Sequence, residues 1–385
     1  MKLKKNKYNK IYHLSHIDLD GYGCQYMTKF LQSEYTDIEY FNADYIDVEK
    51  EIGNVFSLIV QRTADIKSYN ETSLLMRQEY PNILFLITDV SLNEKLEEKI
   101  NNFLKSNKHI KLDVRVLDHH KSGKEIAERN GWYTFNNDKC GSSLTAAFVN
   151  TLHENKELAE HLTFVGEFIE SHDIWKEDSK HFNFSNYLSD VIFNLYFPEF
   201  LKDKKREFLF IYIYNFMTVY NSNEVQTVQD LEIRISFILK ETLSFFIKDK
   251  TVLEDENVRS LYKLYYYYAE EYSKNKDQFE TLVINGLKFK VLYNTDGGFF
   301  QYFSHYVLEH NKEIDFLMRV SPKGKCSFRS VNEDADVDLI ANLLSNGNGG
   351  GHKHASGCSL TFTNSVHSYN EVIKELLLID KVGKL

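Results

Sequence analysis

Residues 82–89 read Asn-Ile-Leu-Phe-Leu-Ile-Thr-Asp, a near-continuous apolar run that ends on an aspartate. Such a run is typical of a strand buried on both faces of a parallel sheet. Short apolar runs and stretches of helical spacing alternate around it, at 11–14, 23–33, 38–41, 92–104 and 114–117. Two further helices should follow, one capped by Ser142 or Ser143 and one beginning near Glu157. The alternation predicts an α/β fold with a mostly parallel sheet.

The middle of the chain has a different composition. Residues 176–278 contain no glycine and are rich in Phe, Tyr, Leu, Lys and Glu. Stretches such as 231–247 and 261–272 have helical periodicity. We therefore expect a helical connector or small helical subdomain here.

Strand patterns return from about residue 279. Two runs of alternating character flank Asn285-Gly286, which predicts a β-hairpin. A helix near 299–309 and strands at 314–320 and 325–330 should complete a second, smaller α/β domain. We expect three parts: a catalytic domain at 1–175, a helical connector at 176–278 and a substrate-binding domain at 279–385.

Charge and composition exclude several classes of protein. The 385 residues carry 56 acidic and 46 basic side chains, a formal net charge of -10, and 43% of them are hydrophobic. Binding to long duplex nucleic acid depends on many phosphate contacts, so this acidic chain does not fit a protein that coats DNA. The longest apolar run, 208–220, is shorter than a membrane span, which needs roughly 18 residues. Four cysteines without a CxxC pair and no secretory signal indicate a cytoplasmic protein.

Acidic and histidine residues gather after the predicted strands. His16, Asp18 and Asp20 follow the first strand, and Asp89 follows the run at 82–88. Asp118-His119-His120 follows the strand at 114–117, and Asp173 ends an apolar helix. The carboxyl ends of parallel strands meet at one edge of a sheet, where ligands bind. These residues should therefore converge.

Carboxylates brought together without compensation repel one another, and divalent cations relieve that repulsion. Mixed carboxylate and imidazole ligands suit Mn²⁺ or a similar ion better than Ca²⁺. The alternating His-x-Asp-x-Asp spacing would place these side chains on one side if the segment stays extended. Gly21 and Gly23 would then let the chain turn from strand into helix beside the site.

These four elements resemble the four motifs of the DHH phosphoesterases, a family named for the triplet found here at 118–120. Residues 349–357, GGGHKHASG, resemble the GGGHxxAxG signature of the associated DHHA1 domain. Residues 327–330, SFRS, resemble the SxRS strand before it. The resemblance covers about 280 residues at both ends of the chain. Within the family, the segment SHIDLDGYGC at 15–24 most resembles the nanoRNase B (NrnB) type of oligoribonuclease.

The resemblance implies two divalent metal ions, Mn²⁺ first and Mg²⁺ or Co²⁺ as alternatives. One would be held by His16, Asp18 and Asp89. The ligands of the other would be Asp20, Asp89, His119 and Asp173, with Asp89 shared. Some family members place the first histidine four residues before the first aspartate, whereas His16 lies two before it, so His13 is the alternative to His16.

The resemblance also implies roles for the rest of the triplet. His120 would face the scissile phosphate, and Asp118 would orient a neighbouring histidine. Two cations about 3.5–4 Å apart would activate a water for in-line attack on phosphorus.

Substrate binding is expected in the last part of the chain. Glycines let backbone N–H groups approach a phosphate or a base closely, which favours the turn at 347–351 as a binding element. Arg329 can form a bidentate pair with a phosphate and lies in a basic strip without acidic residues. The predicted substrate-binding residues are Arg329, Ser330, Gly349, Gly350, Gly351 and His352.

These features predict hydrolysis of short oligoribonucleotides to nucleoside 5′-monophosphates. The expected partners are short single-stranded RNA or dinucleotides, without a membrane or a long duplex, and a homodimer stays open. Cyclic dinucleotides, phosphoadenosine phosphate and single-stranded DNA are alternative substrates. A non-catalytic scaffold on the same fold is the contrasting hypothesis; such relatives lack metal ligands, whereas every acidic ligand is present here.

Overall fold

The protein is described by a computed structural model that covers residues 7–72, 78–194, 203–221, 225–246, 281–284, 286–293, 311–332, 334–345 and 349–360, with residues 300, 303–304, 307–308, 347 and 373–374. The chain divides into two compact units. Unit 1 comprises Met1–Ser189 and Phe197–Val258, and unit 2 comprises Asp190–Tyr196 and Arg259–Leu385. The division into three parts at residues 175 and 278 stays a prediction.

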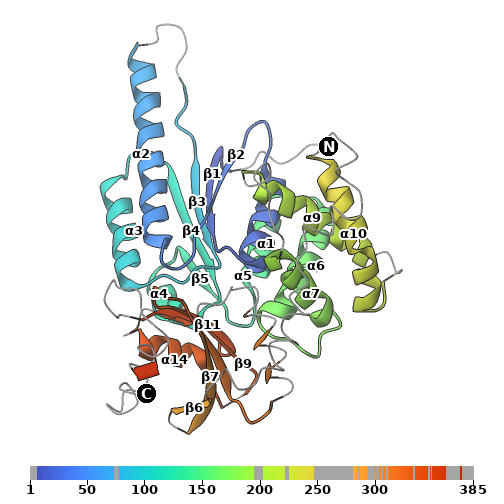
Figure 1. The fold of residues 1–385 in the computed structure, drawn as a ribbon. Coiled ribbons are helices and arrows are strands. Elements are labelled where there is room, and N and C mark those ends of the chain that lie inside the picture. The colour runs from blue at the N-terminus through green and yellow to red at the C-terminus, as the bar shows by residue number, and fades with distance from the viewer. Residues whose placement is uncertain are drawn as a thin grey trace. The chain divides into compact units, whose positions relative to one another are not determined.

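Unit 1 contains a five-stranded sheet in the order β2-β1-β3-β4-β5, and every pair of neighbours in it is parallel (Figure 1). The strands are β1 (Lys10–Ser15), β2 (Asp37–Asn42), β3 (Ile83–Thr88), β4 (Leu112–Asp118) and β5 (Tyr133–Phe135). The central strand β3 is buried along its whole length. The parallel sheet predicted from the run at 82–88 is therefore confirmed.

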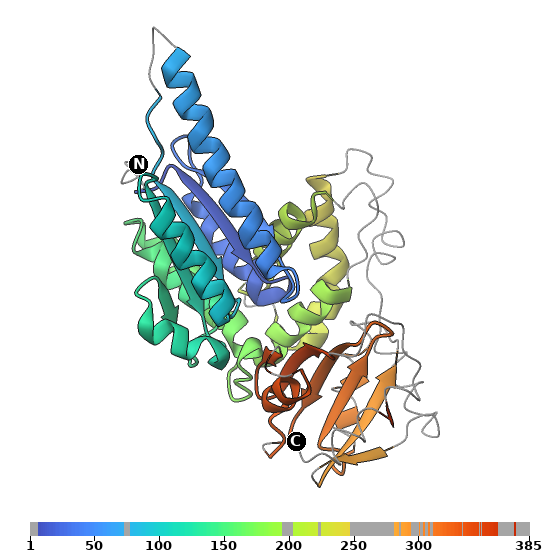
Figure 2. The same cartoon turned by 90° about the vertical axis from the view of Figure 1, so that its left-hand side faces the viewer.

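Helices cover both faces of this sheet, with α2 and α3 on one side and α1, α5 and α6 on the other (Figure 1). The helices of this part are α1 (Leu19–Thr28), η1 (Lys29–Leu31), α2 (Val48–Thr72), α3 (Glu94–Ser106), η2 (Lys121–Gly123), α4 (Lys124–Arg129), α5 (Gly141–Asn150) and α6 (Lys156–Asp173). Figure 2 shows α2 and α3 lying along the sheet from another direction. Two helical layers bury both faces of the sheet, as the apolar character of β3 requires.

Most of the described residues of the middle segment are helical, as predicted. They form α7 (Phe182–Asn194), α9 (Lys205–Tyr220) and α10 (Val228–Ser244). A capping box at Thr227 and Asp230 begins α10, because each side chain bonds the other residue's backbone N–H. The second helical stretch predicted here, 261–272, lies outside the described residues.

Unit 2 contains a six-stranded sheet in the order β10-β11-β9-β8-β7-β6. Its described elements are β6 (Thr281–Ile284), β7 (Leu287–Tyr293), β8 (Phe316–Val320), β9 (Lys325–Ser330), α14 (Val337–Leu344), β10 (Gly350–Gly351) and β11 (Ala355–Ser359). β6 and β7 pair antiparallel around Gly286, whose φ of 83° suits a tight hairpin turn. The predicted hairpin is confirmed, while most of the helix predicted at 299–309 lies outside the described residues.

Several predicted elements differ from the structure. The first helix begins at Leu19, not at Gly23, because Asp18 caps it. The fifth begins at Gly141 with Cys140 as its N-cap, not at Ser142 or Ser143. The helix α2 and the short strand β5 are absent from the predicted elements. The glycines at 350 and 351 belong to the strand β10 rather than to a turn.

Candidate metal centre

The loop after β1 changes direction at Asp18, which is the N-cap of α1. One carboxylate oxygen of Asp18, Oδ1, accepts a hydrogen bond from the backbone N–H of Gly21 at 2.9 Å. The other, Oδ2, lies 2.6 Å from Nδ1 of His16. Asp20 falls inside the first turn of the helix. The segment therefore does not stay extended, because the chain bends at Asp18 into the helix that this residue caps, and the condition under which the alternating spacing would place the side chains on one side is not met.

Gly21 is needed because the carbonyl group of His16 packs closely against it. It does not serve the turn from strand into helix that was predicted from the sequence. A Cβ at this position would lie 2.3 Å from the carbonyl oxygen of His16, nearer than atoms can approach. A Cβ at Gly23 would meet the hydroxyl of Ser142 at 2.2 Å. Both glycines lie within α1 and let neighbouring segments pack against it.

Asp89 follows β3 directly and has an unusual backbone. Its φ of 55° lies in the left-handed region, which few residues other than glycine adopt. Its Oδ1 lies 3.1 Å from Nε2 of His119. Its Oδ2 is buried and has no hydrogen-bond partner among the described residues. A strained backbone that presents a buried, unsatisfied carboxylate oxygen points to a functional position.

The N-terminus of α5 holds Asp20. The backbone N–H groups of Gly141 and Ser142 donate to its two carboxylate oxygens, at 2.6 and 2.8 Å. The hydroxyl of Ser142 donates to the carbonyl oxygen of Asp20 at 2.9 Å. These bonds explain why the helix begins earlier than predicted, because its first N–H groups are satisfied by a distant carboxylate.

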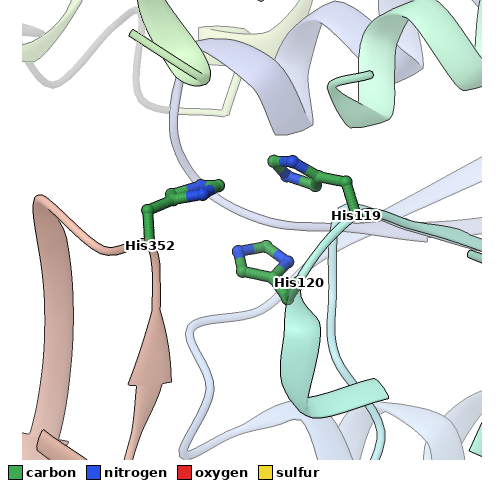
Figure 3. Close-up of side chains that lie close together, drawn as sticks. All are labelled: His119, His120 and His352. Carbon is green, nitrogen blue, oxygen red and sulfur yellow. The ribbon is translucent and has the colours of Figure 1, made fainter. Parts of the chain in front are cut away.

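His119 and His120 follow β4, and their rings lie 4.4 Å apart between centroids (Figure 3). Nε2 of His119 lies 3.1 Å from a carboxylate oxygen of Asp89, 3.5 Å from one of Asp173 and 3.8 Å from one of Asp20. One imidazole nitrogen thus faces three carboxylates that come from the end of β3, from α6 and from α1.

Two groups of potential ligands share Asp89. Candidate donor atoms lie within 4.8 Å of one another in the group His16, Asp18 and Asp89, and also in the group Asp20, Asp89 and His119. Asp173 lies beside the second group, because its Oδ2 is 3.5 Å from Nε2 of His119. The structure therefore brings together the six ligands expected from the resemblance, with Asp89 common to both groups.

A third group consists of Asp20, Asp173 and Cys140. Cys140 is the member of this group that was not predicted from the sequence. The sulfur of Cys140 accepts a hydrogen bond from the N–H of Ser143 as the cap of α5. Burial and the nearby Asp20 raise the pKa of the thiol well above its usual range. Its position two residues before Ser142, the first of the predicted N-cap serines, was the available signal.

The electrostatics of the site favour a bound cation. Burial, together with the neighbouring carboxylates, raises the pKa of both Asp89 and Asp173 well above the ordinary range. The pKa of Asp20 is also raised, by burial and by the charge of Asp18. Burial acts in the same direction on Asp18, but the adjacent His16 outweighs it and lowers its pKa. Clustered, buried oxygen and nitrogen donors fit divalent metal ions, which would replace the missing positive charge.

His120 is held by a chain of hydrogen bonds that the sequence analysis found only in part. Asp118 Oδ1 lies 2.7 Å from Nδ1 of His120, and its Oδ2 accepts from the hydroxyl of Tyr133 at 2.6 Å. Burial opposes ionisation of Asp118, but His120 outweighs it and the pKa is lowered. On the other side of the ring, the hydroxyl of Tyr45 lies 2.9 Å from Nε2. Tyr45 comes shortly after the predicted strand at 38–41, so the rule of strand ends could have indicated it.

His13, the alternative to His16, is not among the gathered ligands. It lies inside β1 and is fully buried, with its ring nitrogens 2.8 Å from the hydroxyls of Thr28 and Thr88. Burial lowers its pKa to about 3, so the ring is neutral. Both nitrogens are occupied in the core of the sheet.

In unit 2, the predicted basic strip occupies one face of the sheet. Lys325, Ser327 and Arg329 alternate along β9 with buried residues, so their side chains share the less buried face. Arg319 of β8 lies opposite Ser327. The guanidinium of Arg329 donates to the carbonyl oxygen of Phe328 at 2.8 Å. Three cationic side chains, those of Arg319, Lys325 and Arg329, thus belong to two adjacent strands.

Ser330 has a different environment from Arg329. Its side chain is buried, and its hydroxyl donates to the carbonyl oxygen of Asp315 at 2.8 Å. The hydroxyl oxygen of Ser330 also accepts a hydrogen bond from the N–H of Asn332 at 3.0 Å. In this structure Ser330 shapes the end of β9, and its role in substrate binding stays a prediction.

The glycine-rich segment forms a tight strand-turn-strand unit. Gly350 and Gly351 pair with β11, and His352 begins the turn that follows, with its N–H 2.6 Å from the carbonyl oxygen of Ala355. Figure 3 labels His352 at this turn. Gly351 has a φ of 151°, and a Cβ there would lie 2.5 Å from the same oxygen. A Cβ at Gly349 would meet the backbone of Ala341 at 2.5 Å. Close packing requires both glycines.

Comparison with known proteins gives two curated relatives that match most of the chain. The chain is 26% identical over 392 residues to the 3′,5′-cyclic-nucleotide phosphodiesterase of Helicobacter pylori (strain ATCC 700392 / 26695), covering 95% of this chain and 97% of that protein. It is 24% identical over 360 residues to oligoribonuclease NrnB of Bacillus subtilis (strain 168), covering 91% of this chain and 73% of that protein. No family model matches the chain.

Among solved structures, RecJ from Thermus thermophilus in complex with Mn²⁺ has a TM-score of 0.49 and 14% identity, covering 98% of this chain and 52% of RecJ. None of the helices in the described part of the chain is long and apolar enough to cross a membrane.

Fold and site together define an α/β protein with a candidate divalent-metal centre at the carboxyl edge of a parallel sheet. The four motifs gathered at that edge, and the similarity of nearly the whole chain to a phosphodiesterase and to NrnB, support a DHH-family phosphoesterase related to NrnB.

Proposed function

We propose that this protein is a metal-dependent phosphodiesterase that hydrolyses short oligoribonucleotides to nucleoside 5′-monophosphates. The observation that carries the proposal is the pair of ligand groups that share Asp89. Both curated relatives are named for cleavage of phosphodiester bonds, which supports the reaction class. NrnB is named an oligoribonuclease, which supports the substrate class.

The donor set suits two divalent ions, with Mn²⁺ first among them because carboxylate and imidazole ligands occur together. His16, Asp18 and Asp89 would hold one ion, and Asp20, Asp89, His119 and Asp173 the other. Ions bound there would act as Lewis acids toward the phosphate and would lower the pKa of a bound water.

The protein's own contribution centres on His120 and on unit 2. Nδ1 of His120 lies 2.7 Å from Oδ1 of Asp118, and this contact would orient the imidazole beside the phosphate. In unit 2, Arg329 and the basic face around it would bind a phosphate of the substrate by charge-assisted hydrogen bonds. Backbone N–H groups of the segment 349–352 would contribute further donors.

A substrate panel tests the proposal. Purified protein with Mn²⁺ is incubated with a labelled RNA dinucleotide, a longer oligoribonucleotide, single-stranded DNA, a cyclic dinucleotide and phosphoadenosine phosphate. We expect the fastest release of mononucleotide from the shortest RNA. A folded protein that releases none from any RNA would contradict the oligoribonuclease assignment.

A second candidate is hydrolysis of a 3′,5′-cyclic mononucleotide. It is favoured by the Helicobacter pylori relative, which matches more of the chain than NrnB does. Cyclic AMP and cyclic GMP therefore belong in the same panel. Faster opening of a cyclic mononucleotide than cleavage of an RNA dinucleotide would select this candidate.

A further inference from the structure

An arginine of helix α9 connects three elements of unit 1. The side chain of Arg206 is partly buried. Its Nε donates to Oε1 of Gln25 at 3.0 Å, and its Nη2 donates to Oδ1 of Asn42 at 3.1 Å. Its Cζ lies 5.2 Å from the centroid of the Tyr40 ring. One guanidinium therefore links the middle segment of the chain to α1 and to the end of β2.

The chemistry of a guanidinium fixes the orientation of both amides. It donates hydrogen bonds and cannot accept them, so each amide presents its oxygen to Arg206 and its nitrogen to another acceptor. Nε2 of Gln25 donates to the carbonyl oxygen of Phe41 at 2.8 Å. Nδ2 of Asn42 donates to the carbonyl oxygen of His16 at 2.7 Å. The contact with Arg206 thus turns the nitrogen of Asn42 toward the loop after β1.

The carbonyl group of His16 is held between two neighbours. On one side it accepts the hydrogen bond from Asn42, and on the other it packs so closely against Gly21 that a Cβ there would lie 2.3 Å from its oxygen. The strand β2 is fixed beside it, since the N–H of Ala43 donates to the carbonyl oxygen of Ser15 at 3.0 Å. These contacts restrict rotation of the peptide that follows His16.

This peptide lies in the chain between two residues of the ligand group formed by His16, Asp18 and Asp89. Nδ1 of His16 lies 2.6 Å from Oδ2 of Asp18, so the two side chains depend on the same short stretch of backbone. The second ligand group is held by other contacts, because the N-terminus of α5 binds the carboxylate of Asp20. A change at Arg206 should therefore act on one ligand group and spare the other.

We propose that Arg206 is a positioning residue for the metal site at His16 and Asp18, and that it acts through the amide of Asn42. The inference rests on the metal sites of the proposed function, not on its substrate. Groups that orient metal ligands from outside the coordination sphere commonly contribute about ten- to a hundredfold in metal affinity. Helix α9, to which the sequence assigned no chemical role, thereby supports the site.

Calorimetric titration of metal-free protein with Mn²⁺ tests the proposal without any turnover. We expect Arg206→Ala to weaken one of the two sites about tenfold and to leave the other unchanged. Arg206→Lys retains the charge, but a single ammonium group lacks the planar fork that holds two amide oxygens, so it should weaken the same site. This variant replaces Arg206→Ala in the test if circular dichroism shows that Arg206→Ala is unfolded. Arg62→Ala, which removes an exposed arginine of α2, should bind both ions as the wild type does.

A double-mutant cycle tests the path through Asn42. Asn42→Ala should weaken the same site, and adding Arg206→Ala should have little further effect, because both changes release the same carbonyl group of His16. Wild-type affinity at both sites in Arg206→Ala and Arg206→Lys, an equal loss at the two sites, or fully additive losses in the double variant would overturn the proposal. If the wild type binds two ions but cleaves no phosphodiester, the proposed function fails while the titration still decides the role of Arg206.

Discussion

At the scale of single residues, Asp89 has the largest role in the site. It belongs to both ligand groups, its backbone is left-handed, and one of its oxygens has no hydrogen-bond partner in the described structure. Each feature costs stability, and a function that needs this carboxylate explains why all three occur together. The sequence predicted its role from its place after a buried strand. It did not predict the left-handed backbone, since Asp is compatible with many conformations there.

Replacing Asp89 with Asn should separate activity from stability. Asn adopts left-handed backbone as readily as Asp but cannot be ionised, so it weakens both ligand groups without straining the chain. We expect turnover to fall at least about a hundredfold. The metal-free variant should be more stable than the metal-free wild type by about 1 kcal/mol, because a repelled buried charge is removed. Denaturant unfolding with EDTA measures the second effect, and Asp65→Asn on the exposed side of α2 is the control. Equal turnover in variant and wild type would refute the role of Asp89.

Arg329 should affect binding rather than the chemical step. In Arg329→Ala we expect KM to rise about tenfold and kcat to stay within about twofold. The lost contact to the phosphate would stabilise the bound substrate and the transition state equally, so its loss weakens binding without slowing the chemical step. Lys325→Ala, on the same face of β9, controls for a general loss of positive charge. Steady-state kinetics on the best substrate of the panel measures both constants. A fall in kcat at unchanged KM would place Arg329 in the chemical step.

At the scale of elements, the order of strands was predictable and the exact starts of helices were not. A short apolar run such as β3, bounded by polar residues, favours a buried strand over a helix because of its length. The start of α5 depends on Asp20, which lies 121 residues before Gly141 and satisfies its N–H group. A local pattern carries no information on such a partner. The helix α2 is a different case, because its buried residues Val48, Ile52, Val55 and Ile59 recur at helical spacing.

The N-terminus of α5 gives a prediction at this scale. A Cβ at Gly141 would lie 2.8 Å from Oδ2 of Asp20 and 2.8 Å from Cβ of Asp89. Gly141→Ala should therefore displace both carboxylates and lower turnover at least about tenfold, while the far-UV circular dichroism stays that of the wild type. Gly131→Ala, where a Cβ would meet nothing within 4 Å, is the matched control. Equal turnover in the two variants would show that α5 does not set the position of the ligands.

At the scale of the whole molecule, the net charge of -10 has a partial explanation. Asp18, Asp20, Asp89 and Asp173 contribute four negative charges when ionised, and two divalent cations would balance them. Attraction for phosphate would then depend on the ions and on the basic face of unit 2. Such an arrangement fits short substrates better than long duplexes, whose binding depends on many separate phosphate contacts.

The raised pKa values of Asp89 and Asp173 predict a pH dependence of stability. A carboxyl group with a raised pKa in the folded state adds stability that is complete below its unfolded pKa of about 4. That stability is lost as the pH rises through the folded-state value. The advantage of metal-free Asp89→Asn over the wild type should therefore grow from about pH 5 to about pH 8. Thermal unfolding across this range, with the difference in Tm between the two proteins as the readout, checks the sign; a constant difference would contradict it.

The central claim is that one carboxylate, Asp89, joins two metal sites at the edge of the parallel sheet. Counting the Mn²⁺ ions bound per chain at equilibrium, by calorimetric titration of metal-free wild-type protein near pH 8, tests it most directly. We predict two ions per chain in the wild type and a loss of affinity at both sites in Asp89→Asn. A single ion per chain, or two sites that Asp89→Asn leaves unchanged, would contradict the account.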